Sequence, residues 1–104
     1  MSATYYGAIH GSRMRFEEVT VSGWIDELAA AFGQDALNGD ETRRLLGVSR
    51  EIAHRVERKE TPLAAFLLGM GVAQRVAEGE RRATAIAGAI EGIEAMLPPA
   101  PDQA

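Results

Sequence analysis

Apolar residues recur at helical spacing early in the chain. The stretch TVSGWIDELAAAFG repeats them every three or four positions, as one face of a helix requires. These residues are Trp24, Ile25, Leu28 and Phe32. Gly33 follows, and glycine commonly ends helices because it tolerates the left-handed backbone conformation there. The pattern therefore predicts a first helix that stops at Gly33.

A second apolar stripe predicts a helix from about Glu41 to Lys59. Asn38-Gly39 is a turn pair, and Asp40 is placed to cap the helix. On a wheel of about 100° per residue the stripe faces the core. It consists of Leu45, Val48, Ser49, Ile52 and Val56.

A third helix is expected from the proline that follows. Thr61 suits the N-cap and Pro62 the first helical position, because proline lacks the amide that would be unpaired there. Residues 63–73 are apolar on every side, which predicts a central, buried helix. Gly79 is expected to end the helix or to kink it.

A fourth helix is predicted over about residues 80–97, with Pro98 and Pro99 as its stop. Short connections make consecutive helices neighbours, so the fold class expected for residues 20–97 is all-α, an antiparallel four-helix bundle. The tail, residues 98–104, is expected to be disordered.

Residues 1–19 do not fit the helical pattern and form an N-terminal extension. They could make a small hairpin around His10-Gly11-Ser12. Alternatively Met14 is the native start, and residues 1–13 precede the native protein. The sequence leaves both alternatives open.

Composition excludes several function classes. The chain has 104 residues, 46% hydrophobic and 25% charged, as expected of one globular domain. Its net charge of -4 disfavours nucleic acid as a partner. Without cysteine, and with His10 and His54 far apart, no metal site is expected. The apolar run 63–73 is too short to span a membrane, and the start lacks a signal-peptide pattern, so a cytoplasmic location is expected.

His54, Arg58 and Glu51 lie in one row opposite the apolar stripe of the second helix. They can be an ordinary solvated face, or they can hydrogen-bond a neighbouring segment and fix the turn into the third helix. They can also form a site for an anion or a partner, because arginine grips carboxylates and phosphates bidentately. Glu57 and Glu60 nearby would repel such groups.

The fourth helix carries small residues at four-residue spacing, which let helix backbones approach closely. They can be the exposed side of an alanine-rich helix, or they can form an interface with a second copy, as a homodimer, or with a larger partner protein. They are Ala85, Gly88, Ala89 and Gly92. No catalytic residues are assigned, since the sequence has no phosphate loop and no recognisable nucleophile set. An enzyme is not expected, although His54 could in principle act as a base.

The stretch REIAHRVERKETPLAAFLLG, preceded by LLGVS and WIDELAAAFG, resembles a small bacterial helical domain family of unknown function. That family occurs alone and as a C-terminal appendage to MobA-like nucleotidyltransferases of molybdenum cofactor synthesis. The resemblance covers roughly residues 22–97. The matching positions are Ala53-His54, Val56, Arg58, Pro62-Leu63, Phe66-Leu67 and Gly69.

The resemblance implies a non-catalytic interaction module or small accessory subunit, associated with a molybdenum enzyme or with molybdenum cofactor maturation. Its expected partner is a protein, namely such an enzyme or a cofactor nucleotidyltransferase, and no cofactor of its own is expected. The alternative is a small-molecule binding domain for an anionic ligand, a nucleotide or a pterin phosphate, at His54 and Arg58. A concave pocket at these two residues would favour the alternative.

Overall fold

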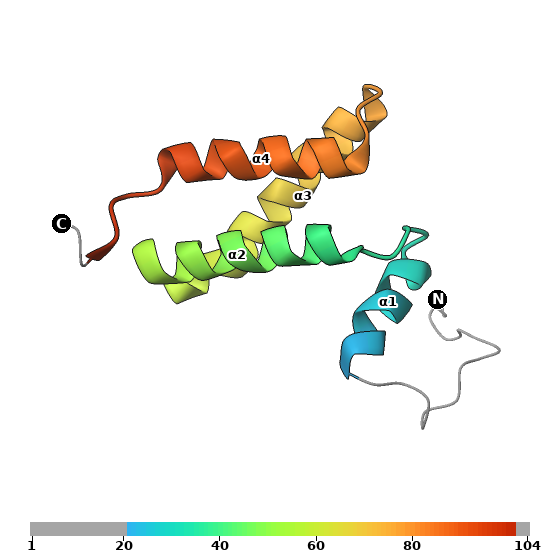
Figure 1. Ribbon diagram of the computed structural model, residues 1–104, viewed down its shortest axis with the longest axis horizontal. Coiled ribbons are helices and arrows are strands. Elements are labelled where there is room, and N and C mark those ends of the chain that lie inside the picture. The colour runs from blue at the N-terminus through green and yellow to red at the C-terminus, as the bar shows by residue number, and fades with distance from the viewer. Residues whose placement is uncertain (1–20, 102–104) are drawn as a thin grey trace. The chain divides into compact units, whose positions relative to one another are not determined.

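The structure, a computed structural model, describes residues 21–101, and the N-terminal extension, residues 1–19, lies outside them (Figure 1). The described part contains four α-helices and one short 3-10 helix, and no strand. The all-α class is therefore confirmed. The chain divides into two units, Met1–Leu37 and Asn38–Ala104, each described below by itself.

The first unit contains α1 (Val21–Ala31). The helix ends as the sequence predicts, because Gly33 adopts the left-handed conformation with φ 69°. The amide of Gln34 then donates to the carbonyl oxygen of Ala29 at 2.8 Å. The apolar side chains Trp24 and Phe32 are exposed.

The second unit begins with α2 (Gly39–Arg55), whose cap differs from the prediction. Asn38, not Asp40, is the N-cap: its side chain accepts from the Glu41 amide at 2.8 Å, and the Glu41 carboxylate accepts from the Asn38 amide at 3.0 Å. This reciprocal pair is a capping box. Asp40 lies in the first turn and pairs with Arg43 and Arg44.

α2 ends at Arg55, earlier than the predicted Lys59. The reversal toward the third helix occupies residues 56–60, where Glu57 is extended and η2 (Arg58–Glu60) forms one 3-10 turn. Val56, predicted to face the core, is 51% exposed because it lies beyond the end of the helix.

α3 (Thr61–Ala77) and α4 (Arg82–Met96) complete this unit, linked by Gly79 at φ 107°. Thr61 is the first residue of α3 rather than its cap, which is Glu60, and Pro62 is therefore the second helical residue rather than the predicted first. α3 leads from the end of α2 back toward its beginning, and α4 returns in the opposite direction to α3 (Figure 1). The first residues of α2 and α4 therefore lie at the same end of this unit.

The core of the second unit lies among α2, α3 and α4. Its buried residues are Val48, Ile52, Val72, Ala85, Ile86 and Ile90, and of these Val48 and Ile52 belong to the stripe predicted for α2. Partly buried Leu45, Ala64, Leu68, Ala89, Ile93 and Leu97 pack around them.

The predicted central position of α3 is wrong. Val72 is its one buried residue, and its large side chains Leu63, Phe66, Leu67 and Met70 are between 59% and 68% exposed. α2 and α4 cover α3 from one side, so the other side stays uncovered within the described residues.

The segment after α4 is held at its start. Arg55 at the end of α2 donates from Nε to the carbonyl oxygen of Pro98 at 2.7 Å. The predicted disorder of the tail concerns residues 98–104, of which 102–104 lie outside the described residues.

Candidate functional site

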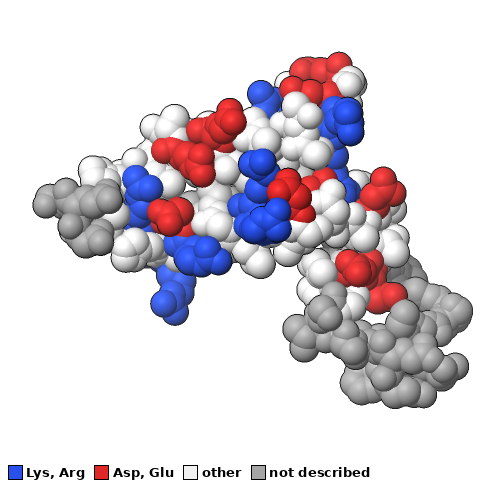
Figure 2. Space-filling model, in the orientation of Figure 1, with Lys and Arg blue, Asp and Glu red and all other residues white. Residues whose placement is uncertain are grey.

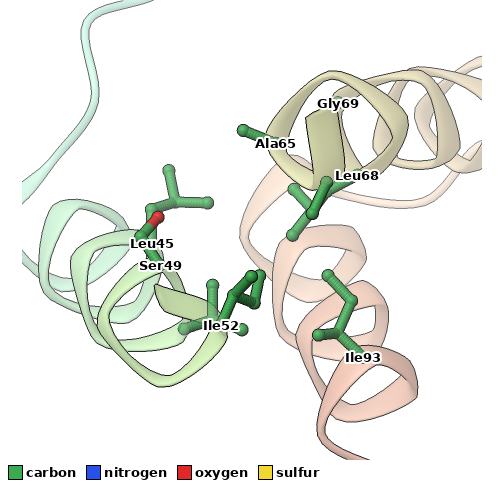
Figure 3. Close-up of a pocket in the computed structure, with 9 residues that line it drawn as sticks. Leu45, Ser49, Ile52, Ala65, Leu68, Gly69 and Ile93 are labelled. Atoms are coloured by element: carbon green, nitrogen blue, oxygen red, sulfur yellow. The ribbon is translucent and has the colours of Figure 1, made fainter. Parts of the chain in front are cut away.

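Residues of α2, α3 and α4 form a groove with apolar sides (Figure 3). Its volume is about 260 Å³. Leu45 from α2, Ala65 and Leu68 from α3, and Ile93 from α4 border the space between the three helices. The full lining is Leu45, Val48, Ser49, Ile52, Ala64, Ala65, Leu68, Gly69 and Ile93.

The chemistry of this groove is almost wholly apolar. The hydroxyl of Ser49 is its one polar side-chain group, and no charged residue lines it. On the α3 side the lining includes Ala64, Ala65 and Gly69, and a Cβ added at Gly69 would meet nothing within 4 Å. Small residues there leave room for the apolar side chains of another helix, the arrangement by which amphipathic helices bind hydrophobic grooves.

His54, Arg58 and Glu51 do not line this groove. His54 is exposed in the last turn of α2, whereas Arg58 is exposed in η2, so the predicted helical row is interrupted at Val56. Glu51 is engaged, because its carboxylate accepts from Arg55 Nη1 at 3.2 Å. The three residues are therefore not assembled around one concave site.

Arg55 joins its helix to another segment through hydrogen bonds, which is the structural role that the sequence analysis considered for His54 and Arg58. It contacts Glu51 in its own helix and the backbone at Pro98. The spacing of four between Glu51 and Arg55 predicts the first contact. The second joins residues distant in sequence, and nothing in the local pattern indicates it.

An ion pair between helices lies where α2 and α4 begin. Arg82 donates from Nη2 and Nε to the two carboxylate oxygens of Glu41, at 2.7 and 3.0 Å. The Glu41 side chain is 4% exposed. The hydrogen bond from Arg82 outweighs the effect of burial and lowers the pKa of Glu41 below 4.5. This pair serves the fold, because it fixes α4 on α2.

The small residues of α4 are distributed over different environments. Ala85 is fully buried and Ala89 packs against the core, so these two face inward in the structure. Gly88 lies under Arg75, whose Nη1 donates to the carbonyl oxygen of Ala85 at 3.3 Å. Gly92 is exposed, with open space around it. Of the four, Gly92 is thus the residue most available to a partner.

Charges of both signs are interspersed over α2 and α4 on the face shown in Figure 2. Among residues 21–101, no group of three or more histidine or acidic side chains is close enough to hold a metal ion. No helix in this part of the chain is both long and apolar enough to cross a bilayer.

Comparison with known families places nearly the whole chain in one of them. Residues 17–103 match a family described as Domain of unknown function (DUF6457). Comparison with curated proteins and with solved structures found no match. The matched residues include all four helices, η2 and the groove. The chain therefore belongs to the DUF6457 family.

Proposed function

We propose that the protein is a cytoplasmic, non-catalytic interaction module or small accessory subunit. Its partner in this proposal is a molybdenum enzyme or a nucleotidyltransferase of molybdenum cofactor synthesis. The molybdenum association rests on the resemblance of residues 22–97 to a family that also occurs fused to MobA-like enzymes.

The apolar groove between α2 and α3 is the observation that supports an interaction module. Small-molecule sites combine apolar sides with several convergent polar groups, whereas this groove offers Ser49 alone. A partner helix needs no more than shape and apolar contact in such a groove, with its polar groups already satisfied internally.

The alternative, an anionic ligand at His54 and Arg58, has weaker support. Both side chains are exposed on separate elements, and neither lines the groove. Beside Arg58, Lys59 is 3.7 Å from the Glu57 carboxylate, so negative charge is already present there. Coordinated binding of a phosphate by several groups is therefore not favoured.

Affinity capture from native cell extract tests the proposal, with the full chain as bait and mass spectrometry as readout. Gly69→Arg places a long charged side chain in the groove. Gly47→Arg is the matched control, because both glycines are helical, neither would place a Cβ near another atom, and Gly47 does not line the groove.

The proposal expects the parent and Gly47→Arg to recover a molybdenum enzyme or cofactor nucleotidyltransferase, and Gly69→Arg to lose it. A third bait carries His54→Ala with Arg58→Ala. If that bait fails to recover the protein while Gly69→Arg still recovers it, the binding site lies at the end of α2 and not in the groove. A parent bait that recovers no molybdenum-related protein would contradict the molybdenum association.

The antiparallel arrangement of all four helices is part of the proposal. It is supported by the short connections at residues 32–38 and 78–81. We also propose, from the family resemblance alone, a bacterial origin and relatives fused to nucleotidyltransferases.

A further inference from the structure

Asn38, the single asparagine of the chain, is followed directly by Gly39. Asparagine followed by glycine undergoes a spontaneous reaction in water, in which the glycine nitrogen attacks the carbon of the side-chain amide and closes a five-membered ring. Glycine permits this attack because it has no Cβ to hinder the approach of the asparagine side chain. The pair therefore has the chemistry of a deamidation site.

The structure gives solvent access to both reacting residues. Asn38 and Gly39 are exposed, and a Cβ added at Gly39 would meet no other atom within 4 Å. Gly39 is the first residue of α2, and the first amides of a helix have no hydrogen-bond partner within that helix. The attacking nitrogen is therefore not held by the helix itself.

The capping box opposes the reaction. Oδ1 of Asn38 accepts from the Glu41 amide at 2.8 Å, which holds the side chain over the start of α2. The Asn38 backbone is extended, with ψ 176°, so its Cβ lies to one side of the Gly39 nitrogen and not in line with it. Ring closure requires both the side chain and the backbone to rotate. The cap must therefore open before the ring can form.

One carboxylate connects this cap to α4. Oε1 of Glu41 accepts from the Asn38 amide at 3.0 Å and from Nη2 of Arg82 at 2.7 Å. Because Glu41 is 3% exposed and held by Arg82, its carboxylate stays in position for the Asn38 amide. Local opening is rarer where more interactions must break together. The pair between Glu41 and Arg82 should therefore reduce the opening of the cap.

We propose that Asn38 deamidates spontaneously in the folded protein, and that the capping box and the Glu41–Arg82 pair keep the reaction slow. A bond forms from the Gly39 nitrogen to Cγ of Asn38, and the bond from Cγ to Nδ2 breaks. The leaving nitrogen takes the proton of the Gly39 amide and departs as ammonia. One water molecule then opens the ring. Its addition at the side-chain carbonyl gives aspartate, and its addition at the main-chain carbonyl gives isoaspartate.

The two products differ in their effect on the fold. Aspartate caps helices as well as asparagine does, and its charge suits a helix N-terminus, so α2 should keep its first turn. Isoaspartate inserts one more carbon into the main chain before Gly39, which changes the spacing that the reciprocal hydrogen bonds with Glu41 require. Isoaspartate should therefore release the start of α2 as the protein ages. This inference does not depend on the molybdenum association.

Peptide mapping of the full chain tests the site during incubation at neutral pH. Each reaction replaces an amide by a carboxylate, so ion exchange separates the modified molecules and mass spectrometry places the change at Asn38. Both the aspartyl and the isoaspartyl peptide should accumulate with time in the parent. Gly39→Ala is the matched control: its methyl group has open space in the fold but hinders ring closure, so the products should be lost.

The same assay tests protection by the fold. The parent should react at least about fivefold faster in urea than in buffer, and Arg82→Ala in buffer should exceed the parent by a similar factor. Arg43→Ala should match the parent, because loss of its exposed pair with Asp40 leaves Glu41 in place. The purified isoaspartyl form should melt at a lower temperature than the parent, whereas Asn38→Asp should not.

Absence of both products from the parent in buffer would overturn the site, even if urea produces them. A Gly39→Ala variant that reacts as fast as the parent would exclude attack by the nitrogen of residue 39. Equal rates in buffer and in urea would overturn protection by the fold, and an Arg82→Ala variant that reacts like the parent would remove the ion pair from it. An isoaspartyl form that melts like the parent would contradict the release of α2.

Discussion

The corner where α2 and α4 begin contrasts with the middle of α3. In the corner a charged residue, Glu41, is 3% exposed, and both its oxygens accept hydrogen bonds from Arg82. In the middle of α3 an apolar residue, Phe66, is 67% exposed. Burial in this protein is therefore decided by which side of a helix another helix covers, and not by the hydropathy of the helix alone.

The contrast also separates stability from binding. The polar groups of the corner satisfy one another within the chain, so their interactions contribute to folding. The apolar side chains of α3 keep most of their surface in water, and the free energy of removing it remains available for association. Four predictions test this separation, beginning with the largest expected effect.

Ile52→Ala should lower the free energy of unfolding by about 2–5 kcal/mol, because the residue is 5% exposed in the core. Leu67→Ala should change it by about 0.5 kcal/mol, as is typical of surface positions. Urea unfolding at low protein concentration measures both without a contribution from association. Equal losses at the two positions would mean that Leu67 is buried in the folded chain.

Arg82→Ala should cost about 1–3 kcal/mol, because it leaves the buried Glu41 carboxylate without its main donor. Arg43→Ala serves as the control. Arg43 pairs with Asp40 at the exposed surface, so its loss should not measurably change the free energy of unfolding. Urea unfolding distinguishes the two. A neutral Arg82→Ala would show that water replaces the arginine at this corner.

The corner should also make stability depend on pH. The pKa of Glu41 is lower in the folded chain than its ordinary value of 4.5, so the unfolded chain binds its proton more tightly. The stabilisation is therefore present above pH 4.5 and is lost as pH falls through the folded pKa. Melting temperatures followed from pH 7 to acid should fall less steeply for Glu41→Gln than for the parent, and parallel curves would contradict this assignment.

The smallest effects are expected at two glycines of α4. Gly92→Ala should stabilise the chain by about 0.4–1 kcal/mol, because open space surrounds the new methyl group and the unfolded chain loses freedom. At Gly88 the same substitution overlaps the Arg75 guanidinium group, which must move away from the Ala85 carbonyl. Gly88→Ala should therefore stabilise the chain less than Gly92→Ala. Melting temperatures of the two variants measure this difference.

The sequence was sufficient for the helices and for most of the core stripes. Periodicity locates Val48 and Ile52 correctly, since polar residues separate the apolar positions of α2. The prediction named Asp40 as the cap of α2 instead of Asn38, although Glu41 three residues after Asn38 is a local signal of the capping box. In both cases the signal lies within a few neighbouring residues.

What the sequence could not provide depends on distant partners. α3 is apolar on every side, so its pattern has no period to indicate the side that meets α2 and α4. The pairing of Glu41 with Arg82 joins positions 41 residues apart, and the groove requires three helices in place. His54 and Arg58 were predicted to lie on one face of a longer helix, because no strong local signal indicates that α2 ends at Arg55.

The bond from Arg55 to Pro98 has a dynamic consequence. Helix ends ordinarily fray independently, but here the last turn of α2 holds the backbone that follows α4. Opening of either helix end breaks the same hydrogen bond. The end of α2 and the end of α4 should therefore open as one cooperative element. Amide hydrogens near Arg55 and near Met96 should then exchange with solvent at rates that change together when Arg55 is replaced.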